Sequence, residues 1–158
     1  MGVCLLFSCL LAAVTVQLCN CVSVVVGVDA ELDETAVDDV GQTEDVIVSQ
    51  WIEVSADVKH QMRERVDEIL RPLGFQTSLV VIRRANSLAL IFLCLTLSAL
   101  MSLRDQWRTK RLRDSVEELF TFLLRRPGTV RVNRLTWPLS DYERCLELFS
   151  FLKGKRWI

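Results

Sequence analysis

The sequence of 158 residues offers little for rigid turns, metal sites or disulfide bonds in its central part. It has only three prolines and a single histidine, His60. No cysteine lies between Cys21 and Cys94, and Cys19 with Cys21 has no second pair at zinc-site spacing. N-x-Ser/Thr glycosylation acceptors are also missing. A disulfide framework in the central part and a paired-cysteine zinc site are therefore excluded.

Catalytic motifs are missing as well. The chain has no Walker loop, no dinucleotide fingerprint and no Cys-x-x-C pair. Any Ser–His–Asp or Cys–His site would have to use His60, which lies beside Lys59 on a predicted surface helix, with no nucleophile elbow in the chain. Cys145 falls on an apolar helix face, which favours a packed thiol. We expect no enzymatic activity, no cofactor, no metal and no small-molecule substrate.

Bases and acids are distributed very unevenly. From Asp29 to Val58 there are ten acidic residues and no base. From Arg104 to the end there are thirteen Lys and Arg against seven Asp and Glu, a local net charge of 13 − 7 = +6. Because acids are interspersed among these bases, membrane proximity explains the excess better than a nucleic acid does. We expect no nucleic-acid partner.

The stretch Ala85–Leu103 contains nineteen residues without a charge. A helix of this length matches the roughly 30 Å hydrocarbon thickness of a bilayer. Its leucines, with Ile91 and Phe92, favour insertion. The sequence therefore predicts a transmembrane helix at residues 85–103.

Small residues recur along this predicted helix. Cys94, Ser98 and Ser102 are spaced by four, with Ala99 beside them. Such a stripe allows close approach of a second helix in lipid. We interpret these four residues as a packing face for other membrane protein subunits.

Basic residues flank the predicted helix on both sides. They are Arg83 and Arg84 before it, and Arg104, Arg108, Lys110 and Arg111 after it. The larger number after the helix predicts, by the positive-inside tendency, that the C-terminal tail is cytosolic.

The N-terminal apolar block has two interpretations. Residues 1–21 match a cleaved signal peptide, with an apolar core at Val3–Val16. Alternatively the block is retained as a membrane helix that extends to about residue 28. Either way, the segment that follows is expected outside the cytosol.

The polar parts divide into three segments. Residues 22–44 are acidic and are expected to be disordered. Residues 45–84 predict a small extracytosolic α/β segment, with a strand at Asp45–Val54, a helix at Ser55–Arg71 and a strand at Phe75–Ile82. The helix is predicted from apolar residues that fall on one face: Val58, Met62, Val66, Ile69 and Leu70. Residues 104–158 predict a basic cytosolic tail with amphipathic helices at 105–126 and after Ser140, and a short strand at Thr129–Leu135 between them.

The last four residues, Lys155-Arg156-Trp157-Ile158, resemble the dibasic C-terminal retrieval signals of endoplasmic-reticulum membrane proteins. Lys155 and Arg156 would carry such a signal. The resemblance implies a membrane protein of the secretory pathway, in the endoplasmic reticulum.

Together these features predict a mainly α membrane protein with one transmembrane helix, a small α/β outer segment and an amphipathic helical tail. The expected function is that of a non-catalytic subunit or adaptor of a membrane protein complex, with membrane lipids and other membrane subunits as partners. One alternative is a membrane-surface or membrane-shaping hairpin protein. A further alternative is a single-pass receptor or signalling protein.

Overall fold

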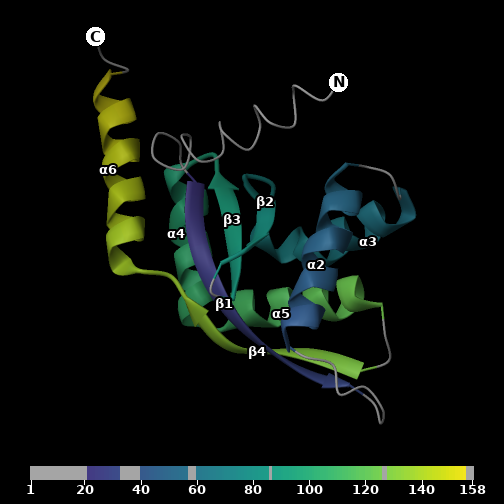
Figure 1. The fold of residues 1–158 in the computed structure, drawn as a ribbon. Helices are drawn as coiled ribbons and strands as arrows, with labels where there is room; N and C mark the ends of the chain where they lie inside the picture. The colour runs from purple at the N-terminus through teal and green to yellow at the C-terminus, as the bar shows by residue number, and fades with distance from the viewer. Residues whose placement is uncertain (1–20, 33–39, 57–59, 86, 126–127, 156–158) are drawn as a thin grey trace, which may run out of the picture.

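The computed structural model describes residues 21–32, 40–56, 60–85, 87–125 and 128–155 (Figure 1). One antiparallel sheet contains β1 (Cys21–Leu32), β2 (Thr77–Arg84), β3 (Leu88–Cys94) and β4 (Gly128–Thr136), in the order β2-β3-β1-β4. Helices α2 (Val40–Ser55) and α3 (His60–Leu70) connect β1 to β2, α4 (Leu97–Arg108) and α5 (Arg111–Leu124) connect β3 to β4, and α6 (Leu139–Lys155) follows β4. This is a split β-α-β arrangement with two helices in each crossover.

The apolar stretch Ala85–Leu103 is not a transmembrane helix. It contains all of β3 and the first half of α4. Among the residues that the structure describes, no helix combines the length and the apolar character needed to cross a membrane. The prediction of a mainly α membrane protein with one transmembrane helix is therefore wrong.

The reason lies in the position of β3 between β1 and β2. Leu88, Leu90 and Phe92 are fully buried on one face, and Ala89 and Ile91 on the other face are only 2% and 4% exposed. A strand buried on both faces has an uninterrupted apolar sequence, which composition alone does not distinguish from a helix segment. The buried side of α4 then extends the apolar run.

Thr96 separates the strand from the helix. Its backbone is extended, with φ −134° and ψ 159°, and its hydroxyl accepts a hydrogen bond from the backbone N–H of Ala99 at 3.1 Å. This is the geometry of a helix N-cap. The side chain that splits the predicted membrane helix is thus a capping threonine in the middle of the apolar run.

The predicted strand at Asp45–Val54 is also wrong, because these residues lie within α2. Ile47, Trp51 and Val54 recur at helical spacing and are buried. The β-branched residues that indicated a strand instead form the core face of a helix, since tertiary packing overrides local propensity.

The segment 22–44, expected to be disordered, contains most of β1 and the start of α2. β1 pairs with β3 on one side and β4 on the other, and its acidic end carries Asp29 opposite Arg131. Strands that are distant in the sequence, with pairs from Val26–Leu88 to Val25–Thr136, therefore order this segment. It shares one sheet with the predicted outer segment and the predicted tail, so these are not separate units.

Other local predictions are confirmed. α3 buries Met62, Val66 and Ile69 as the periodicity predicted, and β2 and β4 lie at the predicted strands. The first tail helix is divided into α4 and α5 at Lys110, whose φ of +67° breaks the helix. The N-terminal block at residues 1–20 lies outside the described residues.

Arg104 joins α4 to the segment that leads into α6. Its Nη1 donates to the backbone carbonyl of Trp137 at 3.0 Å. Its guanidinium carbon lies 4.2 Å from the ring centroid of Trp107 and 5.0 Å from those of Trp137 and Tyr142. Burial, opposed by Tyr142, lowers the pKa of Arg104 from its ordinary value. The residue predicted as a membrane flank is therefore a packing centre between α4 and α6.

Candidate functional site

The two edges of the sheet differ in how they are covered. At the β4 edge, the backbone N–H of Val130 donates to Thr121 Oγ1 at 3.1 Å and that of Val132 donates to Glu117 Oε1 at 2.9 Å. Arg113 Nε donates to the carbonyl of Val132 at 2.7 Å. The three side chains are spaced by four along α5 and take the positions that a neighbouring strand would occupy. The β4 edge is therefore closed against a fifth strand.

Removing this cover is expected to open the β4 edge. Glu117→Ala with Thr121→Ala leaves two backbone N–H groups without their acceptors, which should cost about 2 kcal/mol of unfolding free energy. The freed edge should also promote self-association. Urea unfolding and light scattering measure the two effects, and Glu118→Ala, on the exposed side of the same helix, is the matched control. A monodisperse double variant as stable as the control would contradict this role.

The β2 edge is covered much less. A long side-chain hydrogen bond reaches this edge: Trp51 Nε1 donates to the carbonyl of Val80 at 3.4 Å. Val80 is the extra residue of a bulge, since Leu79 pairs with Phe92 and Val81 with Ile91. Trp51 therefore covers the strand at the bulge, while the residues before the bulge lie beside a groove.

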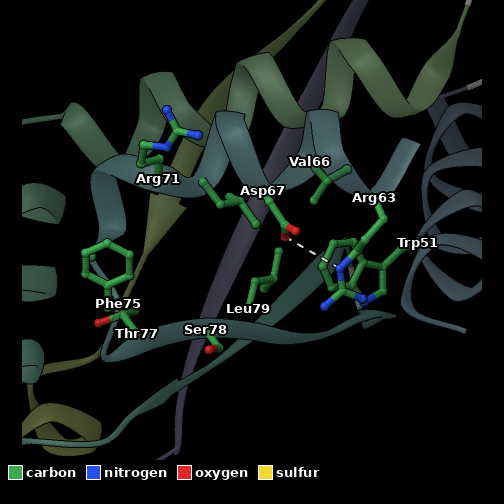
Figure 2. Close-up of a pocket in the computed structure, with 11 residues that line it drawn as sticks. Trp51, Arg63, Val66, Asp67, Arg71, Phe75, Thr77, Ser78 and Leu79 are labelled. Carbon is green, nitrogen blue, oxygen red and sulfur yellow. Dashed lines mark ion pairs between the residues drawn. The ribbon is translucent and has the colours of Figure 1, made fainter. Parts of the chain in front are cut away.

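This groove runs between α3 and β2 and encloses about 350 Å³ (Figure 2). Its apolar lining comes from Trp51, Val66, Leu70 and Leu79. Figure 2 shows that α3 lies along one side of the groove and β2 along the other. At one end Phe75 stands fully exposed, just after Gly74 turns the chain at a φ of +91°.

Polar groups complete the groove. Arg63 Nε lies 3.5 Å from Asp67 Oδ1, and both side chains are exposed (Figure 2). Thr77 is only 7% exposed, and its Oγ1 is buried without a hydrogen-bond partner. A buried hydroxyl in this state is costly, so a ligand that supplies the missing bond would gain affinity. The groove thus offers an apolar floor, an accessible ion pair and an unsatisfied hydroxyl.

The backbone of β2 offers further bonds at this edge. The N–H of Leu95 donates to the carbonyl of Gln76 at 2.8 Å, so Gln76 and Leu95 form a hydrogen-bonded pair. In an antiparallel ladder the pairs alternate, which directs the backbone groups of Thr77 and Leu79 away from β3. The N–H of Thr77 already donates to the carbonyl of Gly74 at 3.5 Å, so the Thr77 carbonyl and the backbone groups of Leu79 are the ones left for another chain. These groups face the groove side of the strand. The arrangement can accept an extended chain.

Three of the predicted membrane-flank residues come together elsewhere. Arg108, Lys110 and Arg111 lie around the turn between α4 and α5. Part of this cluster borders a hollow of about 490 Å³ whose lining also includes Arg113, Asn133 and Arg134. Within the described ranges, Arg108, Lys110 and Arg111 form no ion pair. The turn is a strongly basic surface, which sequence reasoning assigned to a membrane border.

The other flank residues end β2. Arg83 is exposed, and Arg84 forms ion pairs with Glu44 and with Asp45, the latter at 3.4 Å. These pairs tie the end of β2 to the start of α2. Lys155 is the last residue of α6, and Arg156 lies outside the described residues.

The predicted packing stripe is divided between two elements. Cys94 is fully buried at the end of β3. On α4, Ala99 is buried but Ser98 and Ser102 are exposed. The four residues therefore do not form one helix face. A spacing of four places residues on one face only within a continuous helix, and these residues belong to a strand and a helix.

The histidine of the chain lies on the surface of α3. His60 is exposed, and its Nε2 lies 3.4 Å from Glu64 Oε1 on the same helix. In the described part of the chain, no three His, Cys, Asp or Glu residues are grouped so as to hold a metal ion. Sequence reasoning missed the α3–β2 groove, although the apolar positions of α3 and the strand after Gly74 were both recognised.

Comparisons with known proteins identify no family and no relative of this chain. No protein-family model matches the chain. Searches of the curated proteins and of the solved structures also give no match.

Proposed function

We propose that this chain is a non-catalytic adaptor that binds an extended segment of a partner protein along β2. The observation that carries the proposal is the contrast between the two sheet edges. α5 closes the β4 edge with three side chains, whereas the β2 edge before the bulge lies beside the α3–β2 groove. Proteins commonly cover exposed edges, so an edge left beside a lined groove indicates a use.

Addition of a strand explains the chemistry of the groove. A bound segment would donate to the carbonyl of Thr77 and exchange main-chain hydrogen bonds with Leu79, and its alternate side chains would point into the groove. There the apolar lining favours an aliphatic or aromatic side chain, and Arg63 favours a nearby carboxylate. The ligand class is therefore an extended peptide with an apolar residue next to an acidic one.

Two further expectations from the sequence stay predictions. They are the location in the secretory pathway and the membership of the partner in a membrane assembly. The adaptor role requires neither of them.

The test begins with selection of binders from a displayed library of random linear peptides against the full-length chain. The affinity of an enriched peptide is then measured by fluorescence anisotropy. Arg63→Glu should weaken binding about tenfold or more, equivalent to about 1.4 kcal/mol. Arg65→Glu reverses the same charge two residues away on α3, outside the groove lining, and should change affinity less than twofold.

Hydrogen exchange distinguishes strand addition from other modes of binding. The amide of Leu79 should exchange more slowly in the complex, because a new strand would occupy its outward N–H. Binding that is equally sensitive to both arginine variants, or that leaves the Leu79 amide unprotected, would refute the proposal. Failure of the library to yield any peptide that binds would also count against it.

A further inference from the structure

Four large apolar side chains stand exposed at one end of the sheet. Phe75 is 102% exposed, Leu95 59%, Leu97 40% and Met101 54%. They lie at the start of β2, at the end of β3 and on the first turns of α4. We call these four residues the apolar end. Single exposed apolar residues are ordinary, but a group of this kind marks an interaction surface.

Hydrogen bonds bring the four residues to the same place. The N–H of Leu95 donates to the carbonyl of Gln76 at 2.8 Å, and the Thr96 hydroxyl donates to Gln76 Oε1 at 2.6 Å. Further along α4, Gln106 Nε2 donates to the carbonyl of Pro72 at 3.1 Å. The chain from Pro72 to Gln76 therefore runs beside α4 toward its first residue. Phe75 is thereby held beside the N-terminal half of α4.

Two further features, the start of β1 and the end of α6, adjoin this surface. β1 begins there, since Cys21 pairs with Leu93, two residues before Leu95. The preceding residues 1–20 contain no Asp, Glu, Lys or Arg. Figure 1 shows α6 running toward the same end, where its last residues include Lys153 and Lys155 in the sequence. In the sequence, an uncharged stretch therefore precedes β1 at the end of the molecule where the four apolar side chains are exposed, and α6 ends on the same side.

We propose that the apolar end lies on the surface of an anionic lipid bilayer. A single weak apolar anchor gives only marginal, reversible membrane binding, and stable attachment takes a second signal. Here the apolar end supplies the apolar signal, and the basic end of α6 supplies attraction to anionic headgroups. Residues 1–20, which precede β1 in the sequence, carry no charge, and this favours a bilayer over a charged protein surface. The two proposed sites share Phe75, which stands at one end of the α3–β2 groove, whereas Leu97 and Met101 lie outside the groove lining and test the membrane contact separately.

Vesicle flotation of the full-length chain tests this proposal. Vesicles of phosphatidylcholine with phosphatidylserine should float the protein, vesicles of phosphatidylcholine alone should float it less, and added salt should reduce the difference. Leu97→Ser with Met101→Ser should lower the partition coefficient about tenfold or more, because two apolar side chains no longer enter the interface. The matched control is Leu139→Ser at the opposite end of α6, where the side chain is 58% exposed. It should change partition less than twofold.

Circular dichroism and thermal unfolding establish that each variant is folded before flotation is compared. Equal flotation of the double variant and the wild type would overturn the proposal, because the apolar end would then contribute nothing to membrane binding. Absence of flotation of the wild-type chain would overturn it too. Loss of a dimer in solution on Leu97→Ser with Met101→Ser, without any change in flotation, would assign the apolar end to a second copy of the chain instead.

Discussion

Replacing Phe92 with alanine is expected to lower the free energy of unfolding by about 3–5 kcal/mol. Phe92 is fully buried in the central strand β3, and its side chain belongs to the core cluster that the helices complete. Truncation removes the ring and leaves a cavity that neighbouring strands on both sides cannot close. With total stabilities of about 5–15 kcal/mol in ordinary domains, this loss brings the fold close to unfolding.

Leu95→Ala, three residues further along, is the matched control. Leu95 is 59% exposed, so its truncation should change the unfolding free energy by less than about 0.5 kcal/mol. Urea unfolding followed by tryptophan fluorescence measures both variants. Similar effects at the two positions would contradict the assignment of one to a packed strand and the other to the surface. The two variants therefore test directly whether Ala85–Leu103 contains a buried strand that ends before Leu95.

Replacing Arg104 with alanine is expected to cost about 3 kcal/mol. The change removes a charged hydrogen bond to the Trp137 carbonyl and a cation held against three aromatic rings. It also leaves space beneath the edge-to-face contact of Trp137 with Trp107, whose centroids lie 6.4 Å apart. The attachment of α6 to α4 should loosen as a result.

Two variants sharpen this experiment. Arg108→Ala lies one turn further along α4, is exposed, and should change stability by less than about 0.5 kcal/mol. Arg104→Lys keeps the charge but not the planar guanidinium, so it should fall between alanine and the wild type. Urea unfolding gives the three free energies. A lysine variant as stable as the wild type would mean that charge alone, rather than the stacked guanidinium, holds the two helices together.

Arg104 also shows why a sequence pattern alone misplaced several functional residues. Arginines that follow an apolar run resemble the positive flank of a membrane helix. The structure separates them: Arg104 is packed among aromatic rings, whereas Arg108, Lys110 and Arg111 remain on a basic turn. The spacing of three between Arg104 and Trp107 brings these two side chains together on α4. The ring of Trp137, however, lies 33 residues away from Arg104 in the sequence. No local pattern indicates such a contact.

The α3–β2 groove was accessible to sequence reasoning only in part. The apolar periodicity of Met62, Val66 and Ile69 predicted the helix, and the residues after Gly74 predicted a strand. That β2 would form an edge, with its outward backbone groups beside α3, depended on strand order. Strand order is set by pairing of residues far apart in the sequence, which propensity does not encode.

The sequence by itself determined the elements whose apolar spacing is unambiguous: α3, β2, β4 and α6. These elements are buried on one face, so their pattern has a clear period. Only the tertiary structure decided the nature of Ala85–Leu103, because a strand buried on both faces and a membrane helix have the same composition. Thr96 divides that stretch, but its role as a cap becomes visible only when the helix that it caps packs against the sheet. Leu95, Leu97 and Met101 of this stretch stay exposed and belong to the apolar end, which we propose contacts a membrane.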